Sequence, residues 1–236
     1  MLRKESLRLL LGSFVCTVGV LCSGAVWGQV APSPIESSRY QGLHAAASKG
    51  DMAQIQKLIA ARVDLNARDG YGRTPLHVAT FAKQSEAIRA LVNAGAAINL
   101  FENDRYDAVT IASVADDEAT LRTLLSLGAS AKQTTSRYDG TALIAAAHLG
   151  HDGVVRQLIA AGAPLDHVNN LHWTAVIESI VLGNGGARHQ STLKALIDAG
   201  ANLQLKDGQG LTPLQLARQR GYTVMVNMLI AAGAKN

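Results

Sequence analysis

Two histidines, His148 and His151, lie three residues apart in the segment AAHLGHDG, where they could bind a metal ion. Imidazole nitrogens bind zinc, and Asp152 or His167 could supply a further ligand. A zinc site needs three or four ligands that converge on one point, and the sequence shows no complete set. In the structural interpretation, His151 lies in a turn between two helices and His148 on an exposed helical position. A metal-dependent factor or enzyme that uses these histidines is kept as the alternative function.

Other candidates for chemistry are weaker. The glycine-rich segment GNGGAR, residues 183–188, lies between two expected helices and lacks the Gly-Lys-Ser/Thr ending of a phosphate-binding loop. Asp116, Asp117 and Glu118 form an acidic turn that suits the N-terminus of a helix. The chain has two cysteines, both inside the N-terminal apolar segment. We therefore predict no catalytic residue, no cofactor, no metal and no enzymatic activity.

The N-terminal segment predicts export. The start MLRKESLR carries three basic side chains and is followed by the apolar run LLLGSFVCTVGVLCSGAVWG, which is typical of a signal peptide. We predict cleavage after Gly28, with a cut after Ala25 as the alternative. An uncleaved anchor is the other interpretation, because the run approaches the roughly 20 residues of a membrane span. Its small and polar residues, and the prolines that follow, favour cleavage. We expect a periplasmic protein, with secretion to the medium as the alternative.

The charge of the exported chain excludes one class of partner. Removal of residues 1–28 takes away three bases and one acid, so the formal net charge falls from +4 to +2. Nucleic-acid binding needs a concentrated basic face, which a nearly balanced chain does not indicate. Few aromatic residues and many alanines predict close helix packing rather than a deep aromatic pocket. We expect a monomer that binds neither nucleic acid nor, after cleavage, a membrane.

Two independent markers show an internal repeat. The apolar residue after a Thr-Pro-like pair recurs with spacings of 33, 33, 34, 33 and 38, at Leu43, Leu76, Val109, Leu143, Val176 and Leu214. A glycine of a Gly-Ala pair recurs with nearly the same period, at Gly95, Gly128, Gly162, Gly200 and Gly233. A shared period near 33 residues is that of a helical repeat array.

The segment DGYGRTPLHVATFAKQSEAIRALVNAGAAIN, residues 69–99, resembles an ankyrin repeat over its full length. Residues 139–166 and 208–234 are similarly close, and residues 42–66 resemble a first repeat. The resemblance implies an all-α solenoid of about six helix-turn-helix units with short hairpin connections. We expect a signal peptide at 1–28, a flexible linker at 29–39 and the repeat domain at 40–236. The units run approximately over 40–68, 69–101, 102–133, 134–168, 169–206 and 207–236.

Each unit has a predicted helix start. Thr74, Thr141, Thr174 and Thr212 precede helical patterns, where a hydroxyl can accept a bond from an otherwise unpaired backbone N–H, and Asp107 can do the same. In the resembling TPLH motif, His77 would be a buried histidine that ties this helix start to the neighbouring loop. Equivalent positions hold other residue types, among them Thr110 and Gln215, so a shared catalytic duty is excluded.

The resemblance implies a concave face, built from hairpin tips and first helices, that binds another protein. Aromatic and basic side chains gather just before the helix starts, and such residues are the usual anchors of binding hot spots. The candidate contact residues are Tyr71, Arg73, Phe101, Arg105, Tyr106, Arg137, Tyr138, His172 and Trp173. The alternative for each ring is that it packs under its own hairpin.

The fifth unit carries five extra residues within LGNGGARHQS. We expect a flexible loop at Gly183 to Gln190, at the opposite end of the unit from the hairpins. It is either an incidental insertion or a second contact site that uses Arg188 and His189.

These features predict a non-catalytic scaffold in the bacterial envelope that acts as adaptor, inhibitor or protector of another exported protein. Exported ankyrin proteins that the chain resembles include partners of catalases and protectors against toxic or cell-wall-acting enzymes.

Overall fold

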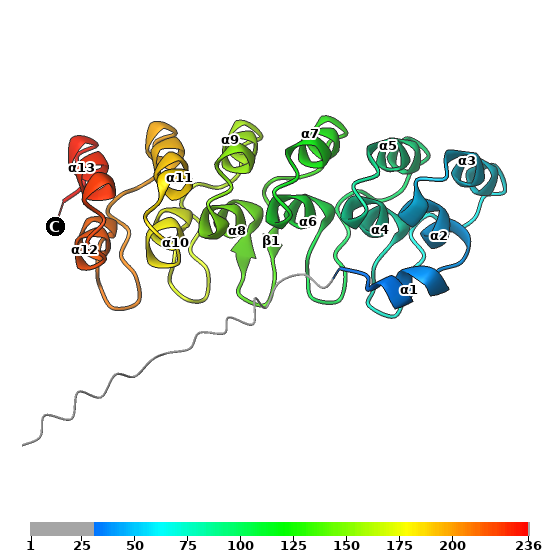
Figure 1. Ribbon diagram of the computed structural model, residues 1–236, viewed down its shortest axis with the longest axis horizontal. Helices are drawn as coiled ribbons and strands as arrows, with labels where there is room; N and C mark the ends of the chain where they lie inside the picture. Colours follow the sequence, from blue (N-terminus) through cyan, green and yellow to red (C-terminus); the bar gives the residue numbers. More distant parts are fainter. Residues whose placement is uncertain (1–30, 236) are drawn as a thin grey trace, which may run out of the picture.

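The computed structural model describes residues 31–235, so the predicted signal peptide and its cleavage sites lie outside the described residues. This part of the chain contains thirteen helices and one two-stranded antiparallel pair (Figure 1). The helices are α1 Pro34–Arg39, α2 Gly42–Lys49, α3 Met52–Ala60, α4 Pro75–Phe81, α5 Ser85–Asn93, α6 Ala108–Val114, α7 Glu118–Ser126, α8 Ala142–Leu149, α9 Asp152–Ala160, α10 Ala175–Val181, α11 Ala187–Asp198, α12 Pro213–Gln219 and α13 Thr223–Ala231. The strands are β1 Thr134–Thr135 and β2 Gly140–Thr141.

Twelve of these helices form six successive pairs, as the repeat predicts. The first helices of the pairs, α2 to α12 in even numbers, lie in one row, and the second helices, α3 to α13 in odd numbers, lie in a row above it (Figure 1). The connecting loops project below the row of first helices. Each pair contacts its neighbours, so the array buries one continuous core although no unit could do so alone. The predicted all-α solenoid is confirmed.

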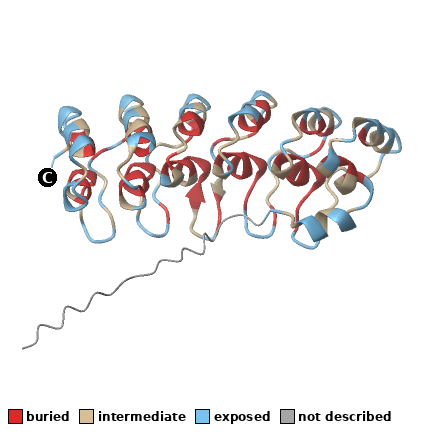
Figure 2. Cartoon of the chain, in the orientation of Figure 1, coloured by how far each residue is buried: buried red, intermediate tan, exposed pale blue. Residues whose placement is uncertain are grey.

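The first helix of each pair contributes most of its residues to the hydrophobic core. They are mostly buried, whereas the second helices expose their outer sides (Figure 2). Alanines such as Ala47, Ala79 and Ala147 are fully buried within this row. Their small side chains let neighbouring first helices approach closely, and larger residues such as Leu91 and Leu158 fill the space between the two rows.

The predicted helix caps are confirmed at every position. The hydroxyls of Thr74, Thr141, Thr174 and Thr212 each accept the backbone N–H of the third helical residue, and the Asp107 carboxylate accepts that of Thr110 at 2.7 Å. At the other end of the units, the glycines of the Gly-Ala pairs have positive φ, which a side chain would disfavour.

Replacing Thr74 with alanine is expected to lower the free energy of unfolding by about 1 kcal/mol, because the N–H groups at the start of α4 lose their cap. Urea denaturation followed by circular dichroism measures the change. Thr223→Ala is the matched control, since this exposed threonine begins α13 without capping it. An unchanged midpoint for Thr74→Ala would show that the cap is dispensable.

Histidines join neighbouring units. The predicted scaffold role of His77 is confirmed: its Nδ1 accepts the Thr74 N–H at 3.0 Å, and its Nε2 donates to the Leu100 carbonyl at 3.0 Å. Five of the seven histidines donate to a backbone carbonyl. His44, His151 and His189 bond an adjacent unit, whereas His77 and His167 bond a loop of their own unit.

The expectation of a flexible linker up to residue 39 is wrong. Residues 34–39 form α1, which begins with a capping box between Ser33 and Glu36. Glu36 Oε1 lies 2.8 Å from Arg73 Nη2, and this ion pair holds α1 against the hairpin that follows the first unit. The sequence pattern of a helical repeat does not extend to these residues, so their order depends on a contact 37 residues away.

The loop predicted at Gly183 to Gln190 is only half as long as expected. Residues 183–186 lie outside the helices, but residues 187–190 form the first turn of α11, which has twelve residues where α9 has nine. His189 is buried and packs against Gly150, where an added Cβ would lie 2.8 Å from the ring. Arg188 lies 2.8 Å from Asp116 in the third unit and 3.5 Å from Asp152 in the fourth. The insertion therefore links three successive units instead of forming a free loop.

Within residues 31–235, every helix is too short or too polar to cross a membrane.

Candidate partner-binding surface

The loops below the first helices are closed hairpins, each numbered by the unit that it begins: hairpin 2 (69–73), hairpin 3 (102–106), hairpin 4 (135–140), hairpin 5 (169–173) and hairpin 6 (207–211). An Asx side chain shapes three of them. Asp69 Oδ1 accepts the N–H groups of Tyr71 and Arg73, and Asn169 and Asp207 do the same in hairpins 5 and 6. These local bonds fix the backbone that carries the candidate contact residues.

Successive hairpins are also bonded to one another. The N–H groups of Asn103, Ser136 and Asn170 donate to the carbonyls of Tyr71, Arg105 and Tyr138, each at 3.0 Å. Hairpins 2 to 5 therefore form one ordered row. Together with the exposed side of the first helices, this row is called the hairpin face below.

Seven of the nine candidate contact residues lie at least partly exposed on this face. Tyr71 is 46% exposed. Arg105, Arg137 and His172 are exposed as well, and Phe101, Tyr138 and Trp173 are partly exposed. Arg137 lies over the ring of Tyr138, with its guanidinium carbon 5.3 Å from the ring centroid. The hairpins thus bring aromatic and cationic groups together, as binding hot spots do.

The prediction of a surface contact is wrong for Arg73 and Tyr106. Arg73 is 1% exposed and lies between two carboxylates, with Asp69 Oδ2 at 2.7 Å and Glu36 Oε1 at 2.8 Å. Its guanidinium carbon also lies 4.4 Å from the centre of the Tyr71 ring. Tyr106 is 9% exposed, and its burial raises the pKa of its hydroxyl. Both side chains are thus buried within the hairpin region and are not presented on the surface.

The sequence prediction missed an apolar group between hairpins 5 and 6. Leu171, Trp173, Val181, Leu211 and Leu216 line a cavity of about 300 Å³ there, with Asp207, Gln219 and Arg220 among its polar lining residues. Leu171 is 42% exposed. It stands two residues after the Asx residue of its hairpin, which is the position of Tyr71 in hairpin 2. Alignment of the hairpins by this Asx residue would have identified it.

The side chains of His148 and His151 contact different partners and do not converge on one point. His148 Nδ1 lies 3.2 Å from Glu178 Oε2, a buried carboxylate that also accepts a bond from Asn169. His151 Nδ1 instead donates to the Ser113 carbonyl at 2.9 Å. Across residues 31–235, no three His, Cys, Asp or Glu side chains are arranged to hold a metal ion. The alternative hypothesis of a metal site therefore lacks a ligand set in this part of the chain.

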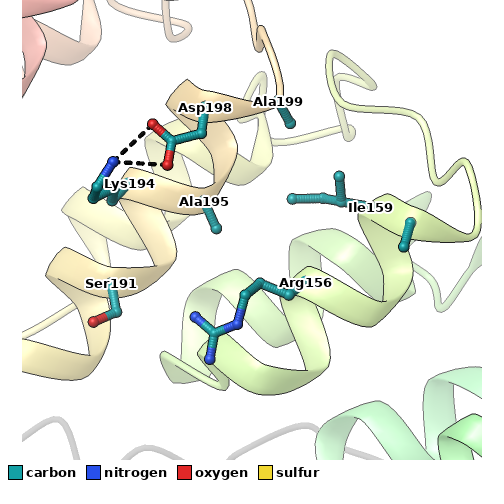
Figure 3. Close-up of a pocket in the computed structure, with 8 residues that line it drawn as sticks. Arg156, Ile159, Ser191, Lys194, Ala195, Asp198 and Ala199 are labelled. Carbon is teal, nitrogen blue, oxygen red and sulfur yellow. Dashed lines mark hydrogen bonds and ion pairs between the residues drawn. The ribbon is translucent and has the colours of Figure 1, made fainter.

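A larger hollow of about 480 Å³ lies on the opposite side, between α9 and α11 (Figure 3). Its rim is charged, but the charges pair within their own helices: Lys194 with Asp198 at 2.7 Å and Arg156 with Asp152 at 2.8 Å. Its apolar wall is formed by Ile159 and alanines. This open hollow has no buried polar group that would orient a ligand, unlike a typical small-molecule site.

Comparison with known proteins agrees with this architecture. Family models described as ankyrin repeats match residues 43–135, 138–170 and 209–236. The chain is 35% identical over 190 residues to the ankyrin repeat protein YahD of Escherichia coli K12. This alignment covers 80% of this chain and 94% of YahD. Residues 171–208, which include the lengthened α11, fall outside the matched ranges.

Solved structures show the same similarity. An ankyrin repeat domain from Acinetobacter baumannii AYE is 44% identical, with a TM-score of 0.78 over 82% of this chain and 98% of that chain. The structure of the Bdellovibrio bacteriovorus endopeptidase Bd0816 in complex with the immunity protein Bd3460 contains a chain that is 24% identical, with a TM-score of 0.68 over 81% of this chain and 98% of that chain. The second similarity shows a shared fold alone.

Proposed function

The chain belongs to the ankyrin-repeat family, and from that premise we propose that it is a non-catalytic scaffold of the bacterial envelope, which binds another exported protein on its hairpin face. The observation that carries this proposal is the ordered row of hairpins. Inter-hairpin bonds order the backbone that carries its exposed aromatic and arginine side chains, so this backbone loses little conformational freedom when a partner binds. The proposed action is that of an adaptor, an inhibitor or a protector of the bound protein.

The location in the envelope rests on the N-terminal sequence. Residues 1–28 have the charged start and apolar middle of a signal peptide, and the chain that follows contains no cysteine. Fractionation of cells that produce the protein tests this part separately. A cleaved product in the periplasmic fraction is expected, and a full-length cytosolic product would contradict the proposed location without bearing on partner binding.

A partner can be isolated by affinity capture from envelope extract with the tagged protein. For the identified partner, the double variant Tyr71→Ala/Arg105→Ala is expected to lose about 2 kcal/mol of binding free energy, the scale of a hot spot. Both side chains are exposed, so the variant should remain folded. Titration calorimetry measures the affinity, and the partner's own activity in the complex distinguishes inhibition from tethering.

Arg188→Ala is the control for this double variant. Arg188 is a half-exposed arginine like Arg105, but it lies in α11, away from the hairpins. Its replacement is expected to leave the affinity unchanged. If Arg188→Ala abolished binding while the double variant kept it, the partner would bind through the α11 side and the hairpin face would be the wrong surface.

A further inference from the structure

The contact between hairpins 5 and 6 differs from the contacts between the preceding hairpins. The position that holds Asn103 in hairpin 3 and Asn170 in hairpin 5 is Gly208 in hairpin 6. Asn170 donates its backbone N–H to the Tyr138 carbonyl and its side-chain amide to the Arg137 carbonyl. Among the hydrogen bonds of residues 31–235, none joins the Gly208 N–H to the carbonyl of Leu171, the residue equivalent to Tyr71, and glycine has no side chain to form the second bond. Hairpins 5 and 6 are therefore not bonded to each other as their predecessors are.

The apolar cavity of about 300 Å³ lies at this opening. Leu171 and Trp173 come from hairpin 5 and Leu211 from hairpin 6, while α10 and α12 contribute Val181 and Leu216. Its volume is at the lower end of the range for ligand sites, roughly 300–1,000 Å³, and suits an apolar side chain rather than a large cofactor. The cavity is called the C-terminal pocket below.

The surroundings of the C-terminal pocket favour an acidic ligand. Arg220 lines it, and Lys206 immediately precedes hairpin 6. Asp207 is the acidic residue among the lining side chains, and its Oδ1 already accepts the N–H groups of Gln209 and Leu211. Neither Arg220 nor Lys206 takes part in the ion pairs found within residues 31–235. A carboxylate beside an apolar anchor would complement Arg220, the cation that lines the pocket.

The backbone at the opening favours an extended ligand. The Gly208 N–H and the Leu171 carbonyl belong to exposed residues at the hairpin tips. In the earlier steps, the equivalent groups bond the next hairpin. The His172 side chain lies beside Gly208, where an added Cβ would be 3.4 Å from the ring, so the two hairpins touch without a backbone bond. An extended chain that lies along the hairpin tips can bond these exposed groups while it places one side chain in the pocket.

We propose that the C-terminal pocket anchors an apolar side chain of an extended, acidic segment of the protein partner. This inference rests on the proposed function, because it specifies where on the hairpin face the partner is held and by what chemistry. It also accounts for an exposed leucine at a hairpin tip, which folding alone does not require.

A random twelve-residue peptide library displayed on phage, selected against the full-length chain, tests the chemistry directly. In a Trp27→Phe background, Trp173 is the only tryptophan, so its emission reports occupancy of the pocket. Enriched peptides are expected to combine a large apolar residue with nearby Asp or Glu, and to shift the Trp173 emission on binding. Failure to enrich such peptides, or enrichment of peptides that leave the emission unchanged, would overturn the proposal.

Two variants and their matched controls locate the binding. Leu171→Asp and Arg220→Glu are each expected to weaken the selected peptides at least tenfold. Ile230→Asp replaces an equally exposed apolar residue on α13, and Arg122→Glu an exposed arginine on α7, and both should leave binding unchanged. Equal binding by Leu171→Asp and the wild type would place the peptides elsewhere.

The captured natural partner separates this proposal from the broader one. If Tyr71→Ala/Arg105→Ala weakens the partner but Leu171→Asp and Arg220→Glu do not, the hairpin face binds the partner and the anchor assignment is wrong. If none of these variants has an effect, both proposals fail. Loss of affinity with the pocket variants, at unchanged thermal stability, supports both.

Discussion

Replacement of Arg73 with methionine is expected to lower the free energy of unfolding by about 3 kcal/mol, the lower end of the cost of removing one partner from a buried ion pair. Arg73 is almost fully buried, and its guanidinium bonds both Asp69 and Glu36. Burial alone would raise the pKa of Asp69, but hydrogen bonds from Tyr40 and Arg73 hold it below its ordinary value. Without Arg73, the Asp69 carboxylate loses its principal counter-charge, and α1 loses its ion pair to hairpin 2. Urea denaturation at neutral pH measures the loss.

Two further variants test this explanation. Hairpin 5 has Asn169 and Trp173 at the positions of Asp69 and Arg73, and Asn169 Oδ1 still accepts two backbone N–H groups. Asp69→Asn added to Arg73→Met should therefore recover much of the stability, because it removes the uncompensated charge and keeps the hairpin bonds. Arg105→Met, which removes a half-exposed ion pair with Asp139, should cost less than about 1 kcal/mol. Equal losses of unfolding free energy for Arg73→Met and Arg105→Met would show that the buried ion pairs of Arg73 stabilise the fold no more than an exposed one.

Acidification is expected to destabilise the fold through His77 by about 3 kcal/mol between pH 6.5 and 4. Burial lowers the pKa of His77 from 6.5 to about 4. The unfolded chain therefore takes up a proton below pH 6.5, whereas the folded chain does so only near pH 4. The stabilisation that neutral His77 provides is complete above pH 6.5 and is lost as the pH falls toward 4. Below pH 4, His77 is protonated in both states and changes the stability no further.

His77→Gln isolates this contribution from that of the carboxylates. In the sixth unit, Gln215 occupies the equivalent position, and its Oε1 accepts the Thr212 N–H at 2.9 Å. Glutamine can therefore replace the local bond of His77 without titrating. Urea denaturation at several pH values between 7.5 and 4 should show a smaller fall in stability for His77→Gln than for the wild type. Parallel curves for the two proteins would mean that His77 titrates with an ordinary pKa in the folded state.

The repeat itself could be predicted because it depends on short-range features. Caps such as Thr74, buried alanines such as Ala79 and the glycines that end the second helices act within one unit or between adjacent units. Each of these features recurs with the period of the chain, so six weak signals combine into a strong one. The role of His77 as a buried, hydrogen-bonded histidine followed from the resemblance of its TPLH motif to that of ankyrin repeats.

The candidate surface could be predicted only in part. The sequence located the contact residues in the hairpins, but it did not distinguish a side chain that projects from one that folds back. Tyr71 is exposed, whereas Arg73, two residues later, turns inward to meet Asp69 and Glu36. Composition identifies an arginine as a typical hot-spot residue, yet its burial depends on a carboxylate from α1, outside the repeat pattern.

The amino-acid sequence by itself determined the solenoid, its six units, the helix caps and the set of loops that carry candidate contacts, because local propensity and strict periodicity encode them. The tertiary structure decided the features that depend on contacts between units. It docked α1 through Arg73, built the insertion into α11 through Arg188 and His189, and opened the C-terminal pocket where Gly208 leaves hairpins 5 and 6 unbonded. The contacts that decide the first two features join residues far apart in the chain, 37 residues for Glu36 and Arg73 and 72 for Asp116 and Arg188, beyond the reach of any local pattern.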